Sequence, residues 1–243
     1  MEMNMDKLAE LQRLIDESDH IVFFGGAGVS TESGIPDFRS QDGLYHQKYD
    51  YPPETILSHT FFMQNTEEFY RFYRDKMLYL DAKPNAAHLA LAKLEKKKKL
   101  KAVITQNIDG LHQKAGSNTV LELHGSVLRN YCMKCGKSYG VDAIVHSEGV
   151  PHCTCGGVIK PDVVLYEEPL DEYITSMAMA YVQSADVFIV GGTSLSVYPA
   201  AGFVYQYMGN KLVLINKSKT QLDSQARLVF DENIGEVFSH LNI

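Results

Sequence analysis

Four polar side chains that can orient or activate a ligand follow short apolar runs of the sequence. Gln106, Asn107 and Asp109 come directly after one such run, and His124 follows the next. Amide and carboxylate groups hold polar ligands by hydrogen bonds, and a histidine that titrates near neutral pH is suited to general-base catalysis. A turn capped by Asn or Asp explains one of the first three residues but hardly all of them. For His124, a structural role and a catalytic role both remain open.

Two turns rich in small residues are candidate phosphate-binding sites. Gly26 and Gly28 follow the apolar run 20–24, and their lack of side chains allows a tight turn and a close approach to a pyrophosphate. We expect Ser30 or Thr31 to cap a helix behind this turn, whose free N–H groups would face the anion. The spacing departs from the G-x-G-x-x-G pattern of dinucleotide sites. A purely structural turn therefore explains this stretch equally well.

Residues beyond the first turn favour the phosphate interpretation. Phe38 and Arg39 add an aromatic face and a guanidinium suited to phosphate. The second turn, which contains Thr193 and Ser194 after two glycines, is a further phosphate or ribose cradle, and Asn216 stands at the exit of a later apolar run. Ligands of open α/β sheets lie outside the carboxyl ends of the strands, so we expect these residues to converge.

All four cysteines of the chain lie close together in the sequence, at Cys132, Cys135, Cys153 and Cys155. In a reducing compartment this grouping indicates metal binding before disulfides. Four thiolates suit a tetrahedral Zn²⁺, and a full set of protein ligands indicates a structural site rather than a catalytic one. Four independent buried thiols are the alternative, and His152 is a spare candidate ligand.

The elements that must position these residues alternate along the chain. About six or seven apolar runs without polar alternation predict strands buried on both faces of a parallel sheet. Segments with apolar residues at helical spacing, such as 5–18, separate them. The predicted fold class is α/β, with a Rossmann-like parallel sheet that has helices on both faces and a small inserted zinc-binding module.

The predicted module interrupts the main domain. We predict a Rossmann-like domain at 1–125 and 160–243, with the zinc-binding module at 126–159 between them. Segment 161–166 is expected to return to the main sheet. The aromatic residues of 55–80 are expected to form a core rather than to line a ligand groove, because aromatic side chains bury large areas in any case.

The composition limits the choice of partners. The net charge of −7 argues against nucleic acid or an anionic membrane surface as the main partner and permits basic peptide substrates. No apolar run approaches the roughly 20 residues of a membrane helix, and the N-terminus lacks the pattern of a secretory signal. We therefore expect a cytoplasmic protein that binds neither membrane nor nucleic acid. A monomer is also expected.

The motifs together resemble those of the sirtuins, the NAD-dependent protein lysine deacylases, in their bacterial form. The matching segments, in the family's order, are 26–39, 105–112, 123–125, 160–166, 192–200 and 215–216. The resemblance covers nearly the whole chain. Several long motifs in the same order are far more specific than a single glycine turn.

The resemblance implies roles for individual residues. His124 would be the general base, and Asn107 would help to position the nicotinamide ribose. Val163, Leu165 and Tyr166 would pair their main chain with the substrate peptide by strand addition. The residues that would contact NAD are Ala27, Thr31, Phe38, Arg39, Gln106, Ile108, Asp109, Thr193, Ser194, Asn216 and Ile234.

The activity that the resemblance implies is NAD-dependent deacetylation of protein lysine. The acyl group would pass to ADP-ribose, with release of nicotinamide and O-acetyl-ADP-ribose. NAD would be the co-substrate, acyl-lysine proteins or peptides the partners, and one structural zinc would stay outside the chemistry. Relatives that prefer succinyl- or malonyl-lysine carry a Tyr-x-x-Arg pair, whereas the matching positions here are Tyr70 and Tyr73. We therefore expect a preference for acetyl or other uncharged acyl groups.

Two positions depart from the family pattern. The second cysteine pair is C-x-C, tighter than the usual spacing, and Glu167-Glu168 replaces the usual Gly-Glu beside the peptide groove. Three other functions remain open: protein ADP-ribosyl transfer, a zinc-stabilised NAD-binding sensor, and an NAD(P)-linked dehydrogenase, which the broken glycine pattern opposes. The acidic balance disfavours a DNA-binding zinc finger.

Overall fold

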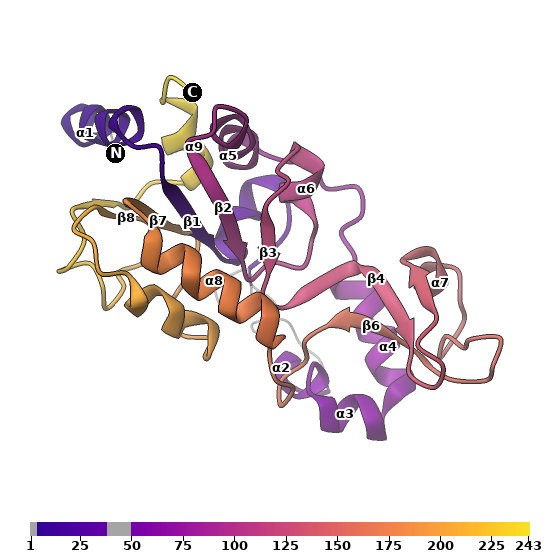
Figure 1. Cartoon of the computed structure of the whole chain (residues 1–243). Coiled ribbons are helices and arrows are strands. Elements are labelled where there is room, and N and C mark those ends of the chain that lie inside the picture. Colours follow the sequence, from indigo (N-terminus) through magenta and orange to yellow (C-terminus); the bar gives the residue numbers. More distant parts are fainter. Residues whose placement is uncertain (1–3, 38–49) are drawn as a thin grey trace.

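The apolar runs form a six-stranded parallel sheet (Figure 1). The structure is a computed structural model that describes residues 4–37 and 50–243. The strands are β1 Ile21–Gly25, β2 Leu100–Thr105, β3 Val120–Glu122, β7 Val187–Gly191, β8 Leu212–Ile215 and β9 Leu228–Phe230. Their order across the sheet is β3-β2-β1-β7-β8-β9, and every neighbouring pair is parallel.

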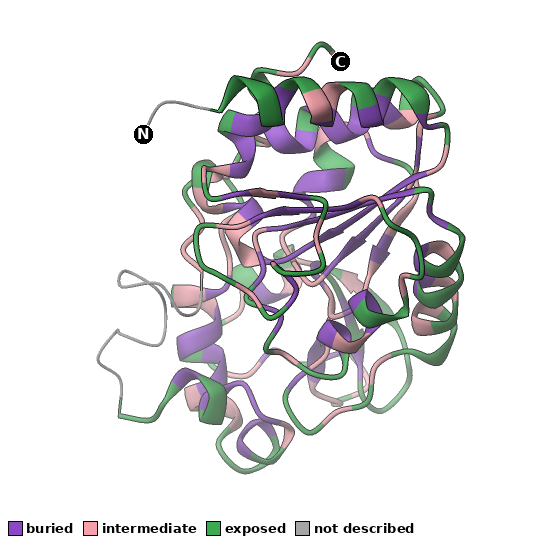
Figure 2. Ribbon diagram, turned by 90° about the vertical axis from the view of Figure 1, so that its left-hand side faces the viewer, coloured by how far each residue is buried: buried purple, intermediate pink, exposed green. Residues whose placement is uncertain are grey.

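Helices cover both faces of this sheet, because successive strand residues point to opposite sides. Phe23 packs into the core on one face and Phe24 into the core on the other. Figure 2 shows the buried strands beneath helices whose outer faces are exposed. The first face carries α1 (Met5–Glu17), α5 (Ala86–Lys96) and α9 (Ile234–Ser239), and the second carries α8 (Glu172–Ser184) and the 3-10 helix η4 (Ala200–Gln206). The predicted α/β class and Rossmann-like sheet are confirmed.

A second, antiparallel sheet lies beside the first and forms what we call the small lobe. Its strands stand in the order β5-β4-β6, and a third core joins them to short helices. The aromatic residues of these helices are buried, as predicted; Tyr70 and Tyr73 are both fully buried. The lobe consists of α2 (Pro53–Ile56), α3 (His59–Gln64), α4 (Thr66–Lys76), β4 (Gly125–Cys132), β5 (Ser138–Gly140), α7 (Asp142–Val145) and β6 (Ile159–Val163).

The prediction that segment 161–166 returns to the main sheet is wrong. Its first residues belong to β6, which pairs antiparallel with β4, so that Val163 lies opposite Gly125. The contact depends on the glycine: Gly125 has a φ of 74°, and a Cβ atom there would collide with the Asp162 carbonyl. An apolar run is compatible with either sheet, so the sequence pattern did not distinguish them. The predicted division of the chain at residues 125 and 160 stays a prediction.

The short helix α6 (Leu111–Ala115) follows the Gln106–Asp109 segment and packs beside α5. Gly110 precedes it with a φ of 72°, and Gly116 ends it with a φ of 101°. Both values lie in the left-handed region that glycine adopts without steric cost. Across the described residues, no helix combines the length and the apolar character needed to cross a membrane.

Candidate active site

The two glycine turns lie against each other at the carboxyl ends of β1 and β7. The Gly28 N–H donates to the Gly192 carbonyl at 2.8 Å, and the Gly26 N–H donates to the Gly191 carbonyl at 3.2 Å. A Cβ atom on Gly28 would lie 2.7 Å from the Gly192 Cα atom, closer than real Cβ atoms approach other atoms. The sequence marks two separate turns, and the fold packs them directly against each other.

The predicted helix behind the first turn is not formed as an α-helix. Two 3-10 turns, η1 (Ala27–Val29) and η2 (Thr31–Ser33), occupy this stretch, and neither has a side-chain cap. The Thr31 hydroxyl instead donates to the Gly28 carbonyl at 3.0 Å. The prediction of a capping Ser30 or Thr31 is therefore wrong. The contact between the two glycine turns, rather than a helix N-terminus, shapes this part of the site.

Ser30 joins the end of β1 to the end of β2. Its hydroxyl donates to Asp109 Oδ2 at 2.6 Å and accepts a hydrogen bond from Asn107 Nδ2 at 3.1 Å. The Leu111 N–H donates to Asp109 Oδ1 at 2.8 Å, so both carboxylate oxygens are held. Sequence reasoning treated Ser30 only as a helix cap and missed this role. Its partner Asp109 lies 79 positions away, and no local signal could have identified it.

Two side-chain amides at the strand ends have a bonded oxygen and a nitrogen without a partner among the described residues. Thr193 holds the other end of each amide: its hydroxyl donates to Gln106 Oε1 at 3.3 Å, and its N–H donates to Asn216 Oδ1 at 2.8 Å. Gln106 Nε2 and Asn216 Nδ2 are buried and have no hydrogen-bond partner among the described residues. A buried donor without a partner is costly. Together with the bare glycine surface, these donors fit a ligand that carries phosphates and ribose hydroxyls, as NAD does.

His124 lies within hydrogen-bonding distance of the end of β2. Its Nδ1 is 3.0 Å from the Gln106 carbonyl oxygen, and because a carbonyl can only accept, Nδ1 carries the proton. The neutral ring then has Nε2 as its acceptor. Burial lowers the pKa of His124, although the hydrogen bond to Gln106 opposes that shift. The geometry therefore provides a neutral imidazole, oriented by the backbone, that can accept a proton through Nε2.

Other predicted cofactor residues lie around the same edge. Ala27 is in η1, and the Ile108 carbonyl accepts from the Val127 N–H at 3.0 Å. The Ser194 hydroxyl is exposed, 2.6 Å from the Ser196 hydroxyl. Ile234 begins α9 and is almost fully buried against Gly191. Phe38 and Arg39, also predicted to contact NAD, lie outside the described residues.

Two further side chains hold the first turn, and sequence reasoning missed both. Asn85, the N-cap residue of α5, donates to the Val29 carbonyl at 2.8 Å. Glu32 accepts from the Gly235 N–H of α9 at 2.6 Å. Asn85 could have been found as a helix cap, but its second contact depends on the tertiary structure.

The three predicted peptide-binding residues follow β6 or end it, close to His124. The main chain of this segment is already bonded within the protein: the Val163 carbonyl accepts from Lys160 Nζ at 3.0 Å. The Leu165 N–H donates to Glu168 Oε2 at 2.9 Å, and the Tyr166 N–H donates to the Leu57 carbonyl at 3.0 Å. Pairing of these groups with a peptide stays a prediction.

The four cysteines gather as predicted. Their sulfur atoms all lie within 4.8 Å of one another. The Cys132–Cys155 and Cys135–Cys153 sulfur distances are 3.5 and 3.7 Å, too long for disulfides and close to the roughly 3.8 Å edge of a tetrahedron of thiolates around Zn²⁺. The Tyr139 hydroxyl donates to Cys153 Sγ at 3.0 Å, an outer contact typical of metal sites. The donor set is compatible with one structural zinc ion.

Comparison with known proteins identifies the family. The model of the Sir2 family matches residues 26–199, which include both glycine turns, His124 and the four cysteines. The chain belongs to the Sir2 family. It is 60% identical to the NAD-dependent protein deacetylase of Clostridium acetobutylicum over 237 residues, which cover 96% of this chain and 97% of that protein.

Solved Sir2 structures share the fold described above. A Sir2 complex with a p53 peptide and NAD+ superposes with a TM-score of 0.86 at 41% identity, covering 98% of this chain and 96% of the other. A Sir2 structure with a deacetylated p53 peptide and 3'-O-acetyl ADP ribose gives a TM-score of 0.88 at 41% identity, with the same coverage. The resemblance stated from sequence motifs is therefore confirmed at the level of the family.

Proposed function

We propose that this protein is an NAD-dependent protein lysine deacetylase, which transfers the acetyl group to ADP-ribose and releases nicotinamide. The observation that carries the proposal is the orientation of His124: the Gln106 carbonyl holds its Nδ1 and leaves Nε2 as the proton acceptor, while Gln106 Nε2 is a buried donor without a partner within the described residues. The deacetylase of Clostridium acetobutylicum and the Sir2 structure with peptide and NAD+ support the same reaction class.

NAD, when bound, supplies an electrophilic ribose carbon and nicotinamide as the leaving group. We expect the phosphates to lie beside the joined glycine turns, where backbone without bulky side chains permits close approach. Gln106 Nε2 and Asn216 Nδ2 would donate to ribose hydroxyls, which would satisfy both orphan donors. Asp109, held by Ser30 and Leu111, would accept from the nicotinamide amide, and Asn107 would position the adjoining ribose.

His124 would take a proton from a ribose hydroxyl at Nε2. Because burial lowers its pKa, the neutral, base-competent ring persists at neutral pH and is lost only below the ordinary histidine value. A profile of kcat/KM against pH should therefore stay level from neutral pH down to about 6.5 and fall below it. An acid limb centred above pH 7 would contradict this assignment.

The remaining parts of the proposal concern the peptide substrate, the zinc ion, the cellular location and the oligomeric state. Acyl-lysine peptides are the proposed partners, and Val163, Leu165 and Tyr166 the proposed peptide contacts. The four cysteines would hold one zinc ion whose ligands are all protein atoms, so it would stabilise the small lobe without chemistry. The preference for uncharged acyl groups, the cytoplasmic location, the monomeric state and the absence of nucleic-acid binding stay predictions.

Mass spectrometry of the products from NAD and a panel of acyl-lysine peptides tests the proposal. We expect nicotinamide, O-acetyl-ADP-ribose and deacetylated peptide in equal amounts, with acetyl-lysine turned over faster than succinyl-lysine. Label from NAD that stays on protein would instead identify an ADP-ribosyltransferase, and NADH absorbance would identify a dehydrogenase. Binding of NAD without any turnover would support the alternative function, a zinc-stabilised NAD-binding sensor.

A further inference from the structure

The segment after β6 connects His124 to the helix α3. At one end, the Val164 N–H donates to the His124 carbonyl at 3.0 Å. At the other end, the Tyr166 N–H donates to the Leu57 carbonyl at 3.0 Å, and the His59 N–H donates to the Tyr166 carbonyl at 2.9 Å. The segment, which we call the 164–168 loop, therefore spans from the candidate catalytic residue to the small lobe.

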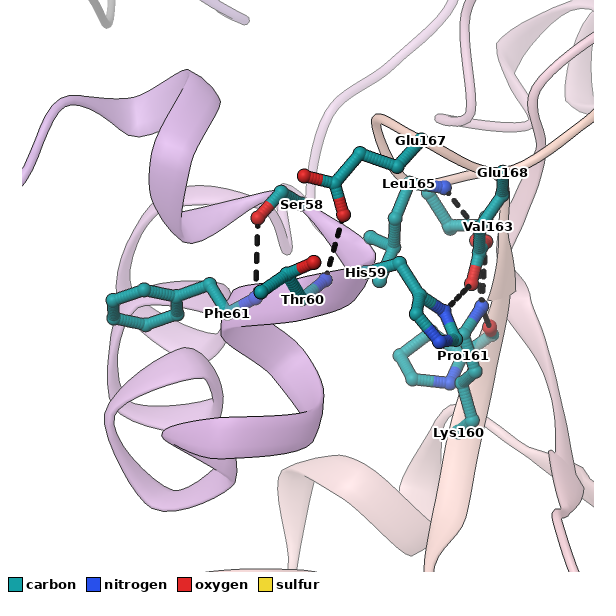
Figure 3. A network of polar contacts seen from close by, with 10 residues as sticks. All are labelled: Ser58, His59, Thr60, Phe61, Lys160, Pro161, Val163, Leu165, Glu167 and Glu168. Carbon is teal, nitrogen blue, oxygen red and sulfur yellow. Dashed lines mark hydrogen bonds and ion pairs between the residues drawn. The ribbon is translucent and has the colours of Figure 1, made fainter.

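Glu168 holds this loop from beneath (Figure 3). Its Oε2 accepts from the Leu165 N–H at 2.9 Å and lies 3.1 Å from Lys160 Nζ, while its Oε1 lies 2.9 Å from His59 Nδ1. The Lys160 side chain is only 5% exposed, so its ammonium depends on this carboxylate and on the Val163 carbonyl. Burial raises the pKa of Glu168, but the bonds from Leu165 and His59 and the charge of Lys160 outweigh it and hold the pKa below its usual value.

Glu167 connects the same loop to α3. Figure 3 shows its carboxylate at the start of that helix, where Oε2 accepts from the Thr60 N–H at 2.9 Å. The Ser58 hydroxyl accepts from the Phe61 N–H at 3.1 Å, so the two side chains satisfy two of the free N–H groups of the first turn. Two adjacent carboxylates thus fasten the loop in two directions.

Glu167 has a backbone conformation that is uncommon for a residue other than glycine. Its φ is 76°, in the left-handed region that costs a residue with a Cβ atom about 1 kcal/mol or more. A glycine, which the family pattern usually has here, would avoid that cost but could not reach Thr60. In this chain the position holds a glutamate, whose side chain accepts a hydrogen bond from α3.

We propose that Glu167 and Glu168 are positioning residues for the peptide substrate. By fastening the 164–168 loop to α3 and to Lys160, they would hold the loop that carries the proposed peptide contacts in one conformation beside His124. A loop that is ordered beforehand does not lose conformational entropy when the peptide binds. Loss of the Glu167 or Glu168 contacts should therefore weaken peptide binding rather than slow the chemical step. The inference rests on the proposed deacetylase function and goes beyond it, because it assigns the residues that set peptide affinity.

The Glu167 series tests the proposal, since this residue is exposed and its replacement should not unfold the protein. Glu167→Ala keeps the backbone cost and loses the bond to Thr60, so we expect the KM for acetylated peptide to rise about tenfold. Glu167→Gly should raise it less, and Glu167→Gln, whose amide oxygen can still accept, should stay within about twofold of the parent. The KM for NAD and kcat at saturating peptide should change less than about twofold in all three.

Glu67→Ala is the matched control, because Glu67 is an exposed residue in the first turn of α4 with no hydrogen bond or ion pair within the described residues. An unchanged peptide KM in Glu167→Ala, or equal rises in the KM for peptide and for NAD, would overturn the proposal. Glu168→Gln gives a second test, with an expected rise in peptide KM that exceeds that of Glu167→Ala. Zinc content and thermal midpoints show whether each variant is folded.

Peptide binding measured by fluorescence anisotropy separates this inference from the proposed function. If the parent protein binds acetylated peptide but releases no nicotinamide from NAD, the deacetylase proposal fails, and the Glu167 series still decides the role of the loop by affinity. If the parent neither binds nor turns over the peptide, both proposals are wrong. If it turns over the peptide and Glu167→Ala binds equally well, only the loop inference fails.

Discussion

The carboxyl edge of the parallel sheet and the small lobe are organised in different ways. At the sheet edge, residues from the ends of β1, β2, β7 and β8 meet because the strands are parallel, and backbone pairing alone brings their ends together. In the small lobe, three strands and several short helices share one core, and four thiols gather at one point. The sheet edge can therefore be preorganised by the protein alone, whereas we expect the part of the lobe around the thiols to need a metal ion. His124 and Gly125 stand at the junction, where β3 has ended and β4 begins.

Removal of zinc should have the largest effect and should separate the two regions. Structural zinc sites contribute about 10–16 kcal/mol of apparent binding energy, so chelation should unfold the small lobe and abolish deacetylation, while the parallel sheet retains its helices. Limited proteolysis should then cut within 126–159 first. Cys135→Ser should act in the same direction. An apo protein with unchanged protease resistance would show that the lobe is self-supporting.

Replacement of the junction residue should leave both regions folded. His124→Ala removes the proposed base, and we expect kcat to fall about 100- to 10,000-fold, the usual contribution of general-base catalysis. Calorimetric NAD affinity and zinc content should change little, because His124 has neither a core role nor a thiol contact. His146→Ala, at an exposed histidine in the small lobe, should keep full activity. Residual turnover within tenfold of the parent would remove His124 from the mechanism.

A methyl group between the glycine turns should damage the sheet edge and spare the lobe. Gly28→Ala places a Cβ atom 2.7 Å from Gly192 Cα, so the turns must separate, and we expect a loss of about 1–3 kcal/mol in stability with weaker NAD binding. Gly140→Ala in β5 is the control, since a Cβ atom there meets nothing within 4 Å. Thermal unfolding and NAD titration measure both effects. Equal NAD affinities in the two variants would mean that the joined turns do not hold the cofactor.

The smallest expected effect concerns two buried histidines in helices beside the parallel sheet, one in α5 and one in α6. His88 and His112 have ring centroids 4.7 Å apart, and burial lowers their pKa values to about 4 and about 3. The folded state therefore keeps them neutral, while the unfolded state binds protons below about pH 6.5. The free energy of unfolding should therefore decrease as the pH is lowered, by about 0.8 kcal/mol for each histidine between pH 7.5 and 6.

His112→Phe tests this account, because a phenyl ring can occupy the site beside Phe23 without titrating. The slope of unfolding free energy against pH between about 6 and 4.5 should decrease by close to one proton. Denaturant titrations at several pH values provide the measurement. An unchanged slope would mean that His112 is already protonated in the folded state.

Much of the fold could be predicted because buried parallel strands have a distinctive composition. The run that ends in Phe23 and Phe24 has no polar alternation, since both of its faces are covered, and the cysteine spacing indicated a metal site directly. Segment 161–166 was assigned to the wrong sheet because an apolar run does not specify its partner. The predicted capped helix after Gly28 was also wrong, because two 3-10 turns without side-chain caps follow β1 there.

The sequence by itself determined the strands of the parallel sheet, which thiols could share a metal, and which polar residues follow strand ends. The tertiary structure decided how those residues act. The Gln106 carbonyl, 18 positions from His124, selects which ring nitrogen carries the proton, and Ser30 meets Asp109 across 79 positions. Glu167 acquires its role only because α3 lies within reach. Local patterns report burial and backbone preference, whereas hydrogen bonds between distant residues depend on how the strands and helices pack.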